Sequence, residues 1–277
     1  MPELPEVETL VQDLIASSLI GSNIVGISLS WERTIALPTP DEFSKRLLNT
    51  KLKKIYRRAK FIVFSFSQDE HLLVHLRMTG RFTLLHNSQE SLPYERVRLL
   101  LSNNRALVYS DPRKFGRFYL VKNPEEILAK LGPEPLEKDF SVSKLAKKLS
   151  VTSRMIKPLL LDQTFLAGLG NIYVDEALWL AKIHPQTAAN RLTKQEVELL
   201  FLSIQEALKR GLKASGTSLG RGKSNFYRLT GEQGSHQEWL QAFRQTGKPC
   251  PRCGHLIERL VVASRSTHIC SRCQILK

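Results

Sequence analysis

The chain has 277 residues, of which 42% are hydrophobic, so it is long and apolar enough for roughly two domains with real cores. Its 41 Lys and Arg outnumber its 26 Asp and Glu, and the formal net charge of +15 favours a polyanionic partner. An anionic membrane surface is the competing partner, but no long apolar run, basic amphipathic helix or signal peptide supports it. We therefore expect a soluble intracellular protein.

The first eight residues combine two prolines and three carboxylates in an otherwise basic chain. Pro5 suits the first turn of a helix, where a missing N–H costs nothing, and Glu6 suits the positive end of the helix dipole. An amphipathic helix is predicted from apolar residues spaced three and four apart: Val7, Leu10, Val11, Leu14 and Ile15. Pro2 and Glu3 precede this helix, and neither is needed to begin it.

Eight short strands are predicted after this helix, separated by turn-type clusters, over residues 24–30, 51–56, 61–66, 72–76, 82–85, 97–101, 106–109 and 118–121. Several strands at short spacing indicate a sandwich or a flattened barrel. Residues 132–135, Gly-Pro-Glu-Pro, mark a domain boundary, because no helix continues through such a sequence.

The hydrophobic period then becomes helical and predicts helices over residues 142–149, 156–162, 172–183 and 194–213. Thr193 and Glu196 form a capping box for the last of them. Residues 215–238 contain five glycines and form a long segment without regular structure. Loops of this length are usually functional or disordered.

All four cysteines lie in the last 28 residues, as two C-x2-C pairs with 16 residues between them: Cys250, Cys253, Cys270 and Cys273. This spacing is typical of a four-thiolate zinc site, whereas two disulfides are disfavoured without a secretion signal. Four thiolates leave no open coordination position, so we expect one structural Zn²⁺. The zinc would hold a hairpin tip at residues 263–266 rigid and present Arg265 to solvent, although a solvated surface arginine is the simpler interpretation.

Three further motifs are ambiguous on their own. Residues 168–171 open a predicted helix, where glycine N–H groups can approach a phosphate, but a plain turn explains them equally well. Residues 57–60 could contact phosphates or form a solvated basic edge, and we favour the edge. Residues 111–116 place cations beside Phe115, which suits insertion into a base stack, yet such a Phe is more often a core anchor. Met78 is likewise a core residue by default.

Together these stretches resemble the formamidopyrimidine-DNA glycosylases, a family that shares its architecture with the endonuclease VIII group. The matching stretches span nearly the whole chain in the family's order: residues 1–10, 57–61, 75–80, 111–118, 132–136, 156–176, 216–219 and 250–274. Leu4 resembles the formamidopyrimidine branch, because the endonuclease VIII branch more often has Gly at this position.

The resemblance implies an α+β multidomain protein. Residues 1–132 would form an N-terminal β-sandwich catalytic domain with flanking helices. Residues 133–238 would form a helix–two-turns–helix DNA-binding domain with a lesion-capping loop at 215–238, and residues 239–277 a four-cysteine zinc finger. DNA would lie in the cleft between the domains.

The implied activity is that of a bifunctional DNA repair enzyme, a monomer in the cytoplasm or at the nucleoid. It would bind damaged double-stranded DNA, excise 8-oxoguanine and formamidopyrimidines, and cleave the strand by β,δ-elimination. The alternatives are an endonuclease VIII-like preference for oxidised pyrimidines and a non-catalytic zinc-finger DNA-binding protein.

The resemblance also implies site residues. Pro2 matches the family's nucleophile, Glu3 its essential acid, Lys60 a lysine that assists elimination, and Arg265 a finger arginine that grips phosphate. Five positions match DNA contacts: Met78, Arg113 and Phe115, which fill the gap left by an extruded base, Asn171, which binds phosphate, and Tyr94, near a usual histidine.

The chain departs from the family's pattern at two places. Gly-Glu-Pro-Gly followed by an aromatic is usual in the capping loop, but this chain has Gln233 and then Ser235. The common Tyr-Gly-Arg before the finger is replaced by Phe243, Arg244 and Gln245. These departures leave the lesion preference and one phosphate contact open.

Overall fold

The computed structural model describes residues 1–220 and 225–277, which form two compact units. The first unit comprises Met1–Ala129 and Ser215–Ser235, and the second comprises Lys130–Ala214 and His236–Lys277. Part of the predicted capping loop, residues 221–224, lies outside the described residues. Among the described residues, no helix is long and apolar enough to cross a membrane. The three-domain boundaries stay a prediction.

The first unit is a β-sandwich of two sheets with strand orders β1-β7-β8-β6 and β2-β9-β5-β4-β3. The strands are β1 (Ile24–Leu29), β2 (Ile35–Leu37), β3 (Leu52–Arg58), β4 (Phe61–Phe66), β5 (His71–His75), β6 (Arg81–His86), β7 (Glu95–Leu101), β8 (Arg105–Ser110) and β9 (Arg117–Val121). All eight predicted strands are present. The unpredicted strand β2 has only three residues, which is too short for an alternating pattern to show.

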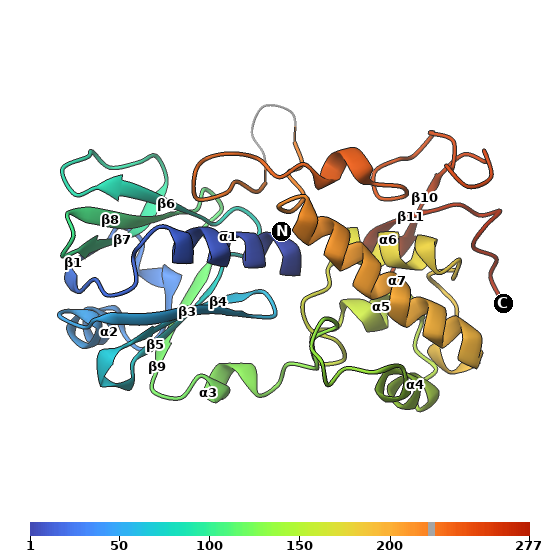
Figure 1. Ribbon diagram of the computed structural model, residues 1–277, viewed down its shortest axis with the longest axis horizontal. Coiled ribbons are helices and arrows are strands. Elements are labelled where there is room, and N and C mark those ends of the chain that lie inside the picture. Colours follow the sequence, from blue (N-terminus) through green and yellow to red (C-terminus); the bar gives the residue numbers. More distant parts are fainter. Residues whose placement is uncertain (221–224) are drawn as a thin grey trace. The chain divides into compact units, whose positions relative to one another are not determined.

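Three helices accompany these sheets: α1 (Leu4–Ala16), α2 (Pro40–Leu47) and α3 (Glu125–Leu128). The helix α1 is labelled in Figure 1. Its buried side, including Val7, Leu10 and Leu14, packs into one core with residues of both sheets. The helix therefore has a fixed position on the sandwich. Its first turn and the residues before it are fixed with it.

The second unit is helical and ends in a β-hairpin. Its helices are α4 (Val142–Ser150), α5 (Ile156–Leu161), α6 (Asn171–Leu180) and α7 (Lys194–Lys213), and its hairpin strands are β10 (Glu258–Val262) and β11 (Arg265–Ile269). The helix α6 packs beside α7, and an ideal Cβ on Gly211 would lie 2.4 Å from Tyr173 Oη. Only glycine permits this approach. The predicted helix at 172–183 ends early because Lys182 has a left-handed backbone, with φ 56°.

Candidate functional site

The residues before α1 lie at a buried end of this helix. Pro2 is buried, and Glu3 is 3% exposed and forms the helix N-cap. Glu3 and Glu6 form a capping box, in which the Glu3 backbone N–H donates to Glu6 Oε2 at 2.8 Å. The positive end of the helix dipole stabilises a carboxylate here. The fold therefore holds an acid next to Pro2, shielded from bulk water.

Lys60 lies in the tight turn between β3 and β4 and is 4% exposed. At the end of β3, Arg57 donates from Nε to Glu8 Oε2 at 2.7 Å and from Nη1 to the Ala59 carbonyl at 3.1 Å. These bonds attach the Lys60 turn to α1. Arg57 is thus part of an internal ion pair, and the prediction of a solvated basic edge is wrong for this residue.

His75, on the neighbouring strand β5, is half-buried near the same turn. Its ring contacts the Phe61 ring edge-on at 5.0 Å, and its Nδ1 accepts from the Arg77 N–H at 3.1 Å. Burial, and then the charges of Arg77 and Lys60, lower the pKa of His75 to about 3. The imidazole is therefore neutral at pH 7 and adds no positive charge beside Lys60.

Asp111, which is 1% exposed, joins three loops of the sandwich. Its side chain accepts hydrogen bonds from Thr79 Oγ1 at 2.5 Å, from the Arg113 N–H at 3.2 Å and from the Gly116 N–H at 2.8 Å. Its own N–H donates to the Tyr94 carbonyl at 3.0 Å. The structure thus brings together the loops that carry four of the five predicted DNA contacts.

These loops present the four side chains to solvent. Met78 is 40% exposed, Tyr94 54% and Phe115 47%, and Arg113 is exposed as well. The Arg113 Cζ lies 4.9 Å from the centre of the Phe115 ring. Met78 and Phe115 are therefore not core residues, contrary to the default interpretation of their motifs. An exposed apolar side chain beside a cation suits insertion between bases.

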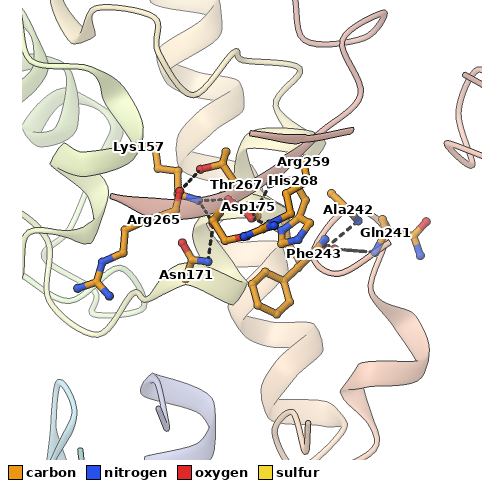
Figure 2. A network of polar contacts seen from close by, with 12 residues as sticks. Lys157, Asn171, Asp175, Gln241, Ala242, Phe243, Arg259, Arg265, Thr267 and His268 are labelled. Atoms are coloured by element: carbon orange, nitrogen blue, oxygen red, sulfur yellow. Dashed lines mark hydrogen bonds and ion pairs between the residues drawn. The ribbon is translucent and has the colours of Figure 1, made fainter. Parts of the chain in front are cut away.

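In the second unit, Arg265 and Asn171 flank the same backbone segment (Figure 2). Arg265 is exposed and follows a two-residue turn in which Ala263 and Ser264 have φ of 47° and 60°. Asn171 is the first residue of α6, and its Nδ2 donates to the Ser266 carbonyl at 2.8 Å. The predicted hairpin tip is confirmed.

A buried cluster of charged and polar side chains holds this hairpin tip in place. Lys157 is 0% exposed and donates from Nζ to Asp175 Oδ1 at 2.5 Å and to the Ser266 carbonyl at 3.0 Å. The other carboxylate oxygen of Asp175 accepts from the His268 N–H at 3.0 Å and lies 2.9 Å from His268 Nδ1. The Arg265 backbone is therefore held by α5 and α6.

The neighbouring Glu176 binds the chain that leads into the first cysteine pair. It is 4% exposed, and its carboxylate accepts from the backbone N–H groups of Gln241 at 3.0 Å, Ala242 at 2.9 Å and Phe243 at 2.8 Å. Sequence reasoning missed both Asp175 and Glu176. Two adjacent acids inside an otherwise apolar helix were the available signal, because charged residues are rarely buried without a partner.

The four cysteines fit one zinc ion. They are free thiols whose Sγ atoms all lie within 4.8 Å of one another, and Cys253 Sγ is 3.4 Å from those of Cys270 and Cys273. Tetrahedral zinc with bonds of about 2.3 Å requires sulfur atoms roughly 3.8 Å apart, close to this arrangement. Cys250 and Cys270 also lie in a small apolar core with Trp179, Ala242 and Ile257. The zinc is structural.

Comparison with known proteins identifies domains along most of the chain. Residues 1–118 match the model of the formamidopyrimidine-DNA glycosylase N-terminal domain, and residues 131–221 match that of its H2TH domain. Residues 247–275 match the zinc finger found in FPG and IleRS.

Curated relatives and solved structures match over nearly the full length. The formamidopyrimidine-DNA glycosylases of Protochlamydia amoebophila and Herpetosiphon aurantiacus are 48% and 43% identical, each over 99% of this chain and at least 99% of the relative. The Lactococcus lactis Fpg with abasic-site DNA is 36% identical with a TM-score of 0.90, covering 99% of both chains. A MutM complex with DNA containing carbocyclic 8-oxo-G is 38% identical with a TM-score of 0.90, over 99% of this chain and 100% of that one. The chain therefore belongs to the formamidopyrimidine-DNA glycosylase family.

Proposed function

We propose that this protein is a DNA glycosylase and abasic-site lyase of base excision repair, which removes oxidised purines from double-stranded DNA. The observation that carries the proposal is the N-terminal site, where buried Pro2 and Glu3 adjoin the positive end of α1. The turn with buried Lys60 is attached to the same helix through Arg57. The protein acts as a monomer in the cytoplasm, at the nucleoid.

The nucleophile is the α-amine of Pro2, after removal of Met1. A free α-amine has a pKa of about 7.7–8.0, against about 10.4 for lysine, so a far larger fraction is neutral and able to attack at pH 7. The nitrogen bonds to the sugar C1′ as the glycosidic bond breaks, and the base leaves with a proton. The sugar ring then opens, as the C1′–O4′ bond breaks and O4′ takes up a proton. Because the amine is secondary, the resulting iminium is cationic without holding a proton.

The iminium then serves as the electron sink for strand cleavage. Loss of a C2′ proton expels the 3′ phosphate, and a second elimination expels the 5′ phosphate. Glu3 donates and accepts protons during ring opening and elimination, and Lys60 assists the elimination. Both side chains are nearly buried, which favours proton transfer between fixed partners.

The damaged base must leave the stack before this chemistry, at a cost of a few kcal/mol. Met78, Arg113 and Phe115 fill the gap, and Tyr94 contacts the DNA from the same group of loops. Asn171 and Arg265 bind phosphates, and zinc stabilises the hairpin that carries Arg265. The capping loop, residues 215–238, covers the extruded base.

Borohydride trapping on a duplex with an abasic site tests the central step. The protein should form a covalent adduct, whereas a protein with a retained tag before Pro2 should form none and excise no 8-oxoguanine. Full adduct formation by the tagged protein would exclude Pro2 as the nucleophile. In parallel, a duplex with 8-oxoguanine opposite cytosine is compared with one containing thymine glycol. Strong preference for thymine glycol would overturn the assignment to oxidised purines.

A further inference from the structure

The segment Ser215–Ser235 is attached to α1 through two acids on one side of the helix. Glu6 Oε1 accepts from the Thr217 N–H at 2.7 Å, while Glu6 Oε2 accepts from the Glu3 N–H. Asp13 lies seven residues further along and binds the segment again. Residues seven apart in a helix lie on the same side, about two turns from each other. One helix thus carries the reactive end of the chain and both attachment points.

The second attachment is a two-pronged ion pair. Arg228 donates from Nη2 to Asp13 Oδ1 at 2.7 Å and from Nε to Oδ2 at 3.2 Å, and the Leu229 N–H also donates to Oδ2 at 3.2 Å. The Asp13 side chain is 9% exposed and that of Arg228 is 30% exposed. Two parallel hydrogen bonds of this kind define the orientation of the guanidinium relative to the carboxylate as well as the distance between them.

The neighbouring residues show that this arm of the segment is packed on the sandwich. Phe226 is 4% exposed, and its carbonyl accepts from Ser218 Oγ at 2.8 Å. Leu229 packs against the sandwich core. Tyr227 lies under the Arg81 guanidinium, with 5.9 Å between Cζ and the ring centre. Arg228 therefore lies in a stretch of the segment whose neighbouring residues are already packed on the sandwich.

We propose that Asp13 and Arg228 are positioning residues for base excision. Their ion pair holds the arm, residues 225–234, on α1 at a defined position relative to the helix end that carries Pro2 and Glu3. The inference rests on the proposed function, in which this segment covers the extruded base. Excision requires that the base be held while its bond to the sugar breaks. A site that is already abasic has no base to hold, so strand cleavage there does not need the pair.

The test compares two reactions in the same preparations of the full-length protein. Arg228→Gln, Asp13→Asn and the double variant are assayed under single-turnover conditions on a duplex with 8-oxoguanine and on one with a preformed abasic site. Each single variant should slow excision about tenfold, as expected for loss of a charge-assisted pair, and the double variant should be no slower than the slower single one. Arg228→Lys keeps the charge but not the two-pronged geometry, so its excision rate should lie between those of the unmodified protein and Arg228→Gln.

Arg46→Gln is the matched control. Arg46 on α2 makes a similar two-pronged pair with Glu70, at 2.7 and 3.1 Å, with side chains 25% and 3% exposed. This variant should lose stability without changing the ratio of excision to abasic-site cleavage.

The outcomes separate cleanly. An excision rate about tenfold lower, with abasic-site cleavage retained within about twofold, supports the inference, because substitutions at unrelated surface positions have much smaller effects. Equal loss of both reactions, or a change in neither, would overturn it. If the unmodified protein cleaves neither duplex, the proposed function itself fails, and the inference fails with it.

Discussion

The loops around Asp111 and the hairpin that carries Arg265 both present predicted DNA contacts, but they are stabilised differently. Asp111 is one carboxylate bound by a hydroxyl and backbone N–H groups, at the edge of a nine-stranded sandwich with a large apolar core. The hairpin has two strands and a core of a few residues. It depends on the zinc site and on two buried acids of α6, Asp175 and Glu176.

The difference reflects how much apolar surface each region can bury. An isolated two-stranded hairpin is marginal in water, and units below about 40 residues usually need a metal or a covalent link. A cluster of buried charges is costly to form, but it is directional and defines one geometry once every member has a partner. The sandwich needs no metal because its strands share a large apolar core and its contact loops begin and end in those strands.

Removing zinc should have the largest effect, and only on the second region. Structural zinc in finger peptides contributes about 10–16 kcal/mol, so the metal-free hairpin should unfold and DNA affinity should fall at least about 100-fold. Fluorescence anisotropy with a labelled duplex measures the affinity, and circular dichroism should show that the sandwich strands persist. Unchanged binding by zinc-free protein would show that the hairpin does not depend on the metal.

Asp175→Asn should destabilise the second unit by about 3–5 kcal/mol, because it leaves the fully buried Lys157 ammonium without its carboxylate. Urea unfolding gives the change. Asp162→Asn, which breaks a pair with the half-exposed Arg154, is the control and should cost below about 1 kcal/mol. Equal effects of the two substitutions would contradict a special role for the buried cluster.

Acid should weaken both units, because each contains a histidine that is neutral in the folded protein. Burial and nearby cations lower the pKa of His75 to about 3 in the first unit and that of His236 to about 4 in the second. Below pH 6.5 these histidines take up protons in the unfolded chain but not in the folded chain. The free energy of unfolding therefore decreases as the pH is lowered.

At pH 5 each of these histidines should cost about 2 kcal/mol relative to pH 8. The measurement is urea unfolding at the two pH values. His236→Gln should remove the part of the stability loss that His236 contributes. An unchanged pH dependence in this variant would show that His236 is not kept neutral by the fold.

Asp111→Asn should have the smallest effect on stability, roughly 1–2 kcal/mol, because the amide keeps one acceptor and the strands keep their core. It should weaken DNA binding more than its stability cost suggests, since several contact loops lose their common acceptor. Asp41→Asn, on exposed Asp41 of α2, is the control. Binding unaffected by Asp111→Asn would show that the loops keep their positions without it.

Local patterns predicted much of this molecule. The strands from β3 to β9 follow from alternating or continuous apolar runs, and α7 begins at the predicted capping box of Thr193 and Glu196. The cysteine spacing predicted the zinc site. The default interpretation of a motif taken alone was wrong where exposure depends on distant packing. Met78 and Phe115 are exposed and do not lie in the core, and Arg57 is paired with Glu8 and does not lie at a solvated edge. The roles of Met78 and Phe115 as DNA contacts stay a prediction.

By itself, the sequence determined the periods of the helices and strands, the ligand set for zinc and the residue types that make a nucleophilic N-terminus chemically reasonable. These properties act over a few residues or depend on spacing. Only the tertiary structure decided which acids hold which loops. Asp111 joins turns from different strands, Asp175 reaches the hairpin at His268, and Asp13 meets Arg228 across 215 positions of sequence. Such pairs form because a buried carboxylate must find donors, and the folded chain alone determines which donors are near.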